Sequence, residues 1–230
     1  MGRQLVFDLA LPEPAYTRAD FVLAPGNREA LAWIDRWPDW PAPVLALSGP
    51  PGCGKTHLAH VWAKRSGAAL LTGADLQGKD VPDLVALVDR TKAVVVEDAR
   101  AAPERALFHL YNLLREQGGH LLLTSGEPPA HWQIALPDLA SRLRAGGAVA
   151  LAPPDDDLLG SIILKQLADR QLHAGPGVVQ YLTSRMERSG DAARLVVAAL
   201  DRRALAEGRE IDRRLAADVL DEIEARKGEG

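Results

Sequence analysis

A glycine-rich loop carries the clearest chemical pattern in the chain. Residues 49–56 are Gly-Pro-Pro-Gly-Cys-Gly-Lys-Thr, a complete G-x-x-x-x-G-K-[ST] phosphate-binding motif. Its glycines let backbone N–H groups approach a polyphosphate, Lys55 can neutralise phosphate charge, and the Thr56 hydroxyl can ligate Mg²⁺. A simple glycine-rich turn before a helix is the alternative. The motif predicts that a nucleotide contacts Gly49, Pro50, Pro51, Gly52, Cys53, Gly54, Lys55, Thr56 and His57.

Two adjacent carboxylates provide the second element of such a site. Glu97 and Asp98 follow the apolar residues 94–96, at the expected end of a buried strand. In the usual order an aspartate assists Mg²⁺ and a following glutamate polarises water, whereas here Glu precedes Asp. We expect Glu97 and Thr56 to assist the metal ion, and we expect the exchanged side-chain lengths to alter the catalytic geometry. Alternatively, the pair only caps the strand.

Five short apolar runs can position these groups. They lie at residues 44–48, 68–72, 93–97, 120–125 and 148–152, and the intervening stretches are long enough for helices. This alternation is typical of a parallel, doubly wound α/β sheet. Helical spacing of apolar residues over 27–37 and 104–117 predicts two of the helices, of which the second packs on the sheet.

The pattern changes after residue 152. Two prolines followed by Asp155–Asp157 mark a break and an acidic helix start, and no strand-like run follows. Helices are expected over about 155–172, 177–188, 190–207 and 212–226. We predict an N-terminal tail at 1–18, a nucleotide-binding α/β domain at 19–152 and a small all-α lid domain at 153–230.

The bulk composition is that of an ordinary soluble protein. The chain has 230 residues, of which 47% are hydrophobic and 25% charged, so it can bury a core. Its apolar runs are far shorter than the roughly 20 residues of a membrane helix, and no signal segment begins the chain. The single Cys53 excludes an intramolecular disulfide. We expect a cytoplasmic protein, and the net charge of −4 argues against direct sequence-specific DNA binding.

Four segments together resemble a known family. They are 54–58 (Gly-Lys-Thr-His-Leu), 107–112 (Leu-Phe-His-Leu-Tyr-Asn), 136–143 (Leu-Pro-Asp-Leu-Ala-Ser-Arg-Leu) and 194–201 (Arg-Leu-Val-Val-Ala-Ala-Leu-Asp). With them the chain resembles the AAA+ replication-initiator group related to DnaA, and within it the Hda family of regulatory inactivators of DnaA. The resemblance covers about residues 4–224 and is most specific at 136–143. It implies the AAA+ P-loop NTPase fold, with a five-stranded parallel sheet and a helical lid.

The resemblance assigns roles to several further residues. It implies that Arg142 is an arginine finger acting in trans, on a nucleotide held by a neighbouring AAA+ subunit, and that Arg194 is the sensor 2 residue of the lid. A surface ion pair and a solvated helix arginine are the respective alternatives, and Arg144 is a second candidate for the arginine finger. The resemblance also implies that Val22, Asn27 and Ile162 face the adenine, with core packing as the alternative for Val22 and Ile162.

The sensor 1 segment departs from the family pattern. Where the family has an acidic sensor residue this chain has Gly126, and where the family next has a basic residue it has Glu127. Thr124 or Ser125 is the candidate to take over the sensor role. Together with the order of the two carboxylates at 97 and 98, this departure predicts weak or no ATP hydrolysis at the chain's own site.

The first residues are similar to a clamp-binding peptide. Residues 4–9, Gln-Leu-Val-Phe-Asp-Leu, resemble the segment by which Hda proteins bind the replicative sliding clamp, DnaN. An extended peptide can insert alternate apolar side chains into a groove while a polar side chain bonds at its edge. The predicted clamp-binding residues are Gln4, Leu5, Phe7 and Leu9. An edge strand is the alternative.

The resemblance favours a regulator of replication initiation. Such a protein binds ADP or ATP with Mg²⁺, is tethered to the clamp, and stimulates hydrolysis of DnaA-bound ATP, which inactivates DnaA. An autonomous AAA+ ATPase, such as a helicase loader or a DnaA-like remodeller, is the alternative. A DNA-binding initiator is disfavoured, because the chain reaches Gly230 without room for a helix-turn-helix domain. Nucleotide-dependent self-association is left open.

Overall fold

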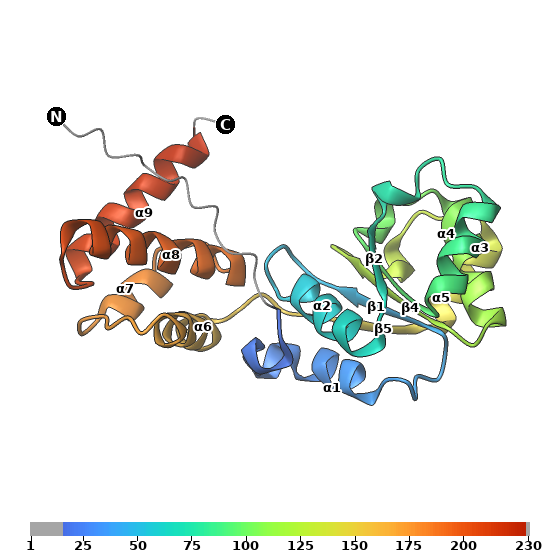
Figure 1. The fold of residues 1–230 in the computed structure, drawn as a ribbon, viewed down its shortest axis with the longest axis horizontal. Coiled ribbons are helices and arrows are strands. Elements are labelled where there is room, and N and C mark those ends of the chain that lie inside the picture. Colours follow the sequence, from blue (N-terminus) through green and yellow to red (C-terminus); the bar gives the residue numbers. More distant parts are fainter. Residues whose placement is uncertain (1–15, 229–230) are drawn as a thin grey trace.

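The computed structural model describes residues 16–228. Figure 1 shows an α/β part, which contains the sheet, beside a bundle of the C-terminal helices. The α/β part contains α1 (Arg28–Arg36), β1 (Val44–Ser48), α2 (Lys55–Ser66), β2 (Ala69–Thr72), α3 (Val81–Arg90), β3 (Ala93–Glu97), α4 (Glu104–Glu116), β4 (His120–Ser125), α5 (Pro137–Ala145) and β5 (Gly147–Ala150). The bundle contains α6 (Asp156–Asp169), α7 (Val178–Thr183), α8 (Gly190–Glu207) and α9 (Arg213–Gly228).

The sheet has five strands, all parallel, in the order β2-β3-β4-β1-β5. The strand β1 therefore lies between β4 and β5, with Ser48 opposite Ser125 on one side and Ala150 on the other. The three inner strands β1, β3 and β4 are buried on both faces, which is why they are continuous apolar runs in the sequence. The predicted doubly wound, five-stranded α/β fold is confirmed.

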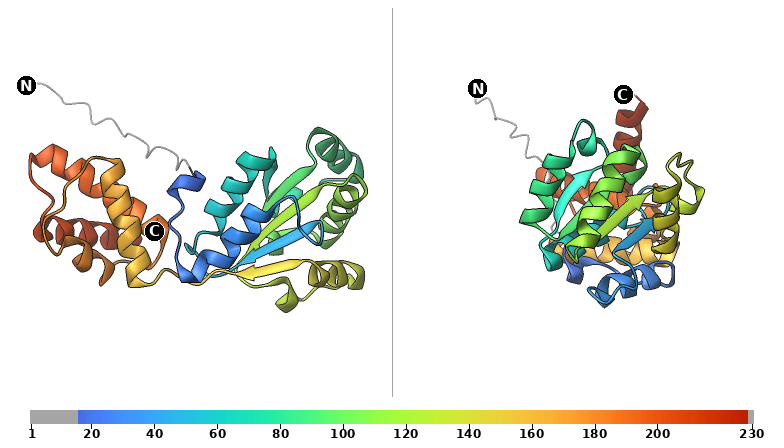
Figure 2. Two further views of the ribbon diagram at one scale, coloured as in Figure 1. Left: turned by 90° about the horizontal axis from the view of Figure 1, so that it is seen from below. Right: turned by 90° about the vertical axis from the view of Figure 1, so that its right-hand side faces the viewer.

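Two apolar clusters cover the two faces of the sheet, and Figure 2 shows helices on both of its faces. Alternation along β1 sends Leu45 and Leu47 into the cluster with α1 and α2, and Val44 and Ala46 into the cluster with α3, α4 and α5. Successive strand side chains point to opposite faces, so one strand contributes to both clusters. The loops at the carboxyl ends of the strands are thereby held on a rigid sheet.

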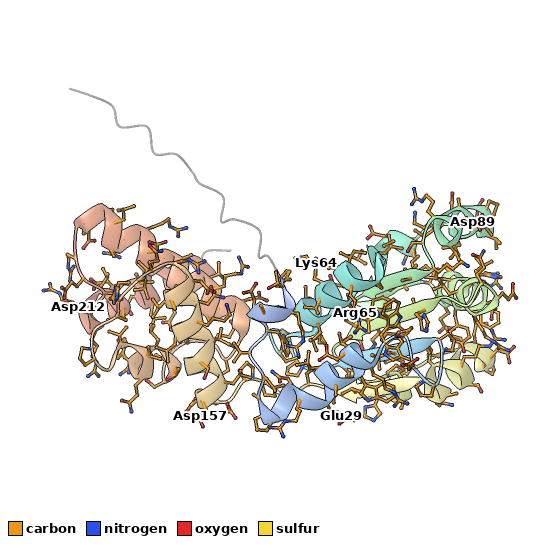
Figure 3. The ribbon with its side chains drawn as sticks, turned by 60° about the horizontal axis from the view of Figure 1, so that its bottom comes forward. Glu29, Lys64, Arg65, Asp89, Asp157 and Asp212 are labelled. Atoms are coloured by element: carbon orange, nitrogen blue, oxygen red, sulfur yellow. The ribbon has the colours of Figure 1, made fainter. Side chains whose placement is uncertain are left out.

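The tryptophans near α1 pack within the α/β part. The ring of Trp40 stacks on Trp62 of α2 with centroids 5.3 Å apart, and its indole N–H donates to the carbonyl oxygen of Trp33 at 2.8 Å. The Arg65 guanidinium, labelled in Figure 3, donates to the carbonyl oxygen of Trp37 at 2.6 Å and so satisfies the carboxyl end of α1. These contacts fix α1 against α2.

The bundle has a core of its own. Leucine, isoleucine and valine side chains of α6, α7, α8 and α9 form a third apolar cluster. The helix α6 begins at the Asp155 side chain, which accepts from the N–H of Leu158 at 2.8 Å. The helix α8 begins at Ser189, whose hydroxyl accepts from the N–H of Ala192 at 3.0 Å.

Several boundaries differ from the sequence expectation by a few residues, and two of them concern local side-chain contacts. The helix α7 ends at Thr183 instead of 188, because the hydroxyls of Thr183 and Ser184 bond the carbonyl oxygens of Gln180 and Tyr181 and compete with the helical bonds. Residues 16–18, expected in the tail, are packed: the carbonyl oxygen of Thr17 lies 2.8 Å from Nε2 of His57 on α2.

Candidate nucleotide-binding site

The loop between β1 and α2 adopts a conformation that its glycines permit. Gly49, Gly52 and Gly54 have φ angles of +148°, +71° and +104°, a region that other residues adopt rarely. A Cβ atom on Gly49 would also overlap the carbonyl oxygen of Leu151 and would lie 2.9 Å from Sγ of Cys53. The motif residues therefore define this backbone path.

Lys55 is the first residue of α2 and curves back over the loop. Its ammonium donates to the carbonyl oxygens of Gly49 at 2.7 Å and Pro50 at 2.8 Å. The amino terminus of α2 adds partial positive charge and free N–H groups at the same place. Anionic phosphate is the ligand class that this arrangement suits.

A cavity of about 410 Å³ opens beside the loop. This volume is within the range of small-molecule sites. It brings together residues predicted from four separate parts of the sequence: Val22, Asn27, Gly52, Cys53, Gly54, Lys55, Thr56, His57, Ile162 and Arg194. Gly49, Pro50 and Pro51 belong to the same loop but do not line the cavity, and neither do Glu97, Asp98 and Arg142.

The wall formed by α8 touches the phosphate loop directly. The N–H of Gly190 donates to the carbonyl oxygen of Gly52 at 3.2 Å, and a Cβ on Gly52 would overlap the Cβ of Ser189. Arg194, one turn along α8, lines the cavity, and its Nε is buried without a hydrogen-bond partner among residues 16–228. A buried donor of this kind is suited to an anionic ligand. Asp191 is 3.9 Å from the same guanidinium.

The wall formed by residues 16–27 is held by side-chain bonds. The buried Asn27 amide donates to the carbonyl oxygen of Val22 at 2.9 Å, and its oxygen accepts from the N–H of Ala24 at 2.8 Å. Asn27 therefore shapes the segment that carries Val22. His57 is enclosed by the rings of Tyr16 and Phe21, and burial lowers the pKa of this histidine.

Several lining residues were not singled out from the sequence. Lys165, Gln166, Asp169 and Arg170 line the cavity from α6, together with Ile162. They follow Ile162 at helical spacing of three, four, seven and eight residues, which is the signal that would have identified this face. Tyr16, Asp20, Phe21 and Asp191 also line the cavity, and no local pattern marks them.

The acidic pair ends β3 near this region but outside the cavity lining. Glu97 is half-buried, and its Oε1 has no hydrogen-bond partner within the described residues. Asp98 is exposed, and its N–H donates to the hydroxyl of the buried Thr124 at 3.3 Å. Glu127 pairs with Arg100 at 3.2 Å. The sensor 1 segment therefore contacts the acidic pair through Thr124.

Arg142 lies away from the chain's own cavity. It is near the carboxyl end of α5, which leads into the start of β5, whereas the phosphate loop follows the end of the parallel β1. Its guanidinium lies 4.6 Å from the ring centroid of Phe108 and 5.5 Å from that of Tyr111. Its Nη1 is buried without a hydrogen-bond partner among residues 16–228.

The next statements apply only to the residues that the structure describes. Gln4, Leu5, Phe7 and Leu9 lie outside residues 16–228, so the clamp-binding segment stays a prediction. Within 16–228 no group of three or more His, Cys, Asp and Glu side chains could hold a metal ion by itself. No helix in that range is long and apolar enough to cross a membrane.

The sequence is similar to that of a curated replication initiator. The chromosomal replication initiator protein DnaA of Thermomicrobium roseum is 29% identical over 205 residues, and the match covers 76% of this chain and 42% of that protein. The chain thus spans about two fifths of this relative's length. No protein-family model matches the chain.

Solved structures of DnaA share the fold. Domain III of Thermotoga maritima DnaA matches with a TM-score of 0.78 at 21% identity, covering 91% of this chain and 97% of that chain. AMPPCP-bound DnaA from Aquifex aeolicus matches with a TM-score of 0.68 at 19% identity, covering 94% and 70%. The fold is the AAA+ P-loop NTPase fold, and the chain is DnaA-like in sequence.

Proposed function

We propose that this chain is a DnaA-related regulator of replication initiation. It binds ADP or ATP at the phosphate loop and stimulates hydrolysis of ATP held by DnaA, which inactivates DnaA. The cavity beside Lys55 and the similarity to DnaA, two matching structures of which are bound to AMPPCP, support the nucleotide part of this proposal.

The placement of Arg142 is the observation that carries the regulatory part. A guanidinium that acted on the chain's own nucleotide would have to line its own cavity, and Arg142 does not. Stacking on Phe108 and Tyr111 holds the guanidinium on α4 without a carboxylate partner in the described residues. An arginine presented in this way can stabilise charge on a phosphoryl group held by a neighbour, an effect of roughly 10³ to 10⁵ in rate.

The chain's own site is proposed to hold nucleotide rather than to hydrolyse it rapidly. The exchanged order of Glu97 and Asp98 and the open position at Gly126 depart from an efficient catalytic set. Thr56 and Glu97 are hard oxygen donors that suit Mg²⁺, and the partnerless Oε1 of Glu97 fits such a cation. Bound Mg²⁺ would neutralise phosphate charge.

Nucleotide is further proposed to control the position of the lid. We treat residues 19–152 and 153–230 as two domains, since the second has an apolar core of its own. The helix α8 of the second domain contacts the phosphate loop at Gly52 and brings Arg194 to the cavity, so a bound nucleotide would contact both domains. The segment at residues 4–9 tethers the protein to the sliding clamp.

An autonomous AAA+ ATPase is the second candidate. The observation that favours it is the buried, partnerless Oε1 of Glu97 at the end of β3, which could polarise water. This candidate predicts fast, clamp-independent ATP turnover that disappears in Lys55→Ala.

A reconstituted assay tests the proposal. Hydrolysis of DnaA-bound ATP would be measured with DNA-loaded clamp and either the intact chain, Arg142→Ala, or a Gln4→Ala/Leu5→Ala double variant. We expect strong stimulation by the intact chain, a loss of at least 100-fold in Arg142→Ala, and a loss in the double variant that excess protein partly restores.

Arg144→Ala is the matched control, because Arg144 is an exposed arginine of the same helix. It should stimulate DnaA like the intact chain. Equal activity of Arg142→Ala and the intact chain, or no stimulation by either, would overturn the regulatory role.

A further inference from the structure

Tyr16 forms part of the cavity wall that no sequence motif assigns. Its ring lies 4.8 Å from His60 and 5.2 Å from His57, both on the helix that starts at Lys55. It lines the cavity together with Asp191 and Arg194 of α8. The tyrosine therefore packs on the phosphate-loop helix and faces the same cavity as the first turns of α8.

The backbone around Tyr16 is held in an unusual conformation. Its φ of +35° lies in the left-handed region, which non-glycine residues rarely adopt. Such conformations persist where surrounding contacts over-determine them, and they cluster at ligand sites. Here the next residue, Thr17, is fixed by the 2.8 Å contact between its carbonyl oxygen and Nε2 of His57.

Residues 16–20 are anchored to three helices. The Thr17 contact reaches α2, a 3.0 Å ion pair joins Arg18 to Asp35 of α1, and a 2.9 Å ion pair joins Asp20 to Lys165 of α6. We call residues 16–20 the strap. Figure 2 (left) shows the strap, in blue, between α2 and the helical bundle.

Tyr16 lines the cavity together with Lys55 and Arg194, the two cations expected to face the phosphates. Burial raises the pKa of this phenol, the carboxylates of Asp191 and Glu97 raise it further, and the Arg194 guanidinium opposes them. The hydroxyl therefore stays protonated at neutral pH and can donate a hydrogen bond. A phosphate oxygen is the acceptor that suits a donor beside Arg194 and Lys55.

We propose that Tyr16 is a nucleotide-contacting residue whose hydroxyl donates to the β- or γ-phosphate of a bound adenine nucleotide. This inference rests on the proposed nucleotide binding and adds a contact from outside the phosphate loop. Because the strap is also anchored to α6, the same contact links the phosphates to the position of the bundle.

Nucleotide competition tests the contact. The affinities of ADP, AMPPCP and AMP for the full chain would be measured with Mg²⁺, by displacement of a fluorescent ADP from the intact chain, Tyr16→Phe and Tyr181→Phe. Loss of a hydrogen bond to a charged group predicts about tenfold weaker ADP and AMPPCP binding in Tyr16→Phe. AMP binding should be unchanged, because AMP lacks the contacted phosphates.

A control variant and the contrary outcomes distinguish failure of the Tyr16 contact from failure of nucleotide binding. Tyr181 is a tyrosine of α7 outside the cavity, so Tyr181→Phe should bind all three nucleotides like the intact chain. Equal ADP affinity of Tyr16→Phe and the intact chain overturns the contact, while nucleotide binding itself stands. If Tyr16→Phe weakens ADP binding and AMP binding equally, Tyr16 has a merely structural role, and this result also overturns the contact. If the intact chain binds no nucleotide, the proposed function and the contact fail together.

Discussion

At the residue scale, Gly52 connects the phosphate loop with the bundle. A side chain there faces two separate penalties, namely the left-handed φ of +71° and the overlap with Cβ of Ser189. Gly67, at the carboxyl end of α2, has nearly the same φ of +68° but open space around it. The two glycines therefore separate the effect of conformation from the effect of contact.

We expect Gly67→Ala to lower the free energy of unfolding by about 1 kcal/mol and to leave nucleotide affinity unchanged. Gly52→Ala should lower nucleotide affinity at least tenfold, because α8 must move away from the loop. Thermal unfolding and ADP titration of both variants measure these effects. Similar ADP affinity in the two variants would contradict the role assigned to the Gly52–Ser189 contact.

His57 makes stability depend on pH. Its pKa is lowered from the usual 6.5, chiefly by burial, with smaller contributions from His60 and Lys64, while the Thr17 carbonyl oxygen and Asp20 oppose the shift. In a window below pH 6.5 the unfolded chain binds more protons than the folded chain, so the free energy of unfolding falls as pH is lowered.

Urea unfolding at pH 7.5 and 5.5 should show this loss, and it should be smaller in His57→Gln. His131→Gln is the control, because His131 is exposed in a short 3₁₀ turn at residues 129–131 and should leave the pH dependence intact. His120, whose burial also lowers its pKa, contributes with the same sign. An unchanged pH dependence in His57→Gln would contradict this account.

The predictability of the site differs among its residues. Gly49–Thr56 could be found because the motif specifies a local backbone path that the flanking strand and helix complete. Tyr16 and Asp191 could not, because their place in the cavity depends on how the strap and α8 pack, which short-range spacing does not encode. Arg142 and Arg194 were identified through family resemblance alone.

At the element scale, α8 depends on its first residues. Ser189 is buried, its hydroxyl accepts from the N–H of Ala192, and the same residue packs on Gly52. We expect Ser189→Ala to lower the free energy of unfolding by about 1 kcal/mol through loss of the cap, and to weaken ADP binding because the first turn frays at the cavity.

Ser184→Ala provides the comparison for this change. Ser184 is exposed after α7, where its hydroxyl bonds a carbonyl oxygen instead of a helical N–H. Ser184→Ala should change the free energy of unfolding by less than about 0.5 kcal/mol and should leave ADP affinity unchanged. If both serine variants have the same ADP affinity, α8 does not position the cavity through its cap.

The strands were more predictable than the helix ends. Residues such as 93–97 and 120–125 are buried on both sheet faces, so their apolar character alone marks them. The end of α7 was not predictable, because apolar spacing continues through Leu182 and Met186 although side-chain hydroxyls stop the helix at Thr183. The spacing of apolar residues shows which face of a helix is buried, but it does not show where the helical hydrogen bonds end.

At the scale of the whole molecule, the ion pair between Asp20 and Lys165 joins the strap to the bundle. The Thr17 hydroxyl and Lys165 lower the pKa of Asp20, so the pair contributes stability above the usual value of 3.8 and loses it in acid. Both side chains are partly exposed, which limits their coupling to at most about 1 kcal/mol.

A double-mutant cycle with Asp20→Asn and Lys165→Met should give a coupling energy of about 0.3–1 kcal/mol that vanishes in 1 M salt. The pair Arg203–Glu207, within α8, is the matched control, since its removal cannot loosen the strap. Nucleotide affinity should fall in the Asp20 and Lys165 variants, which also lose a cavity-lining side chain, and should not change in the Arg203 and Glu207 variants. Full additivity of the two changes would exclude a coupling through this pair.

The order of the strands has a consequence for how the protein is made. The strand β1 carries the phosphate loop, yet its two neighbours are residues 121–125 and 147–150, which leave the ribosome much later. Parallel pairings of such long sequence separation form slowly. The phosphate loop therefore cannot be braced on both sides until most of the α/β part has been synthesised. During that interval the apolar strand β1 lacks its partners, a condition in which exposed apolar surface promotes aggregation.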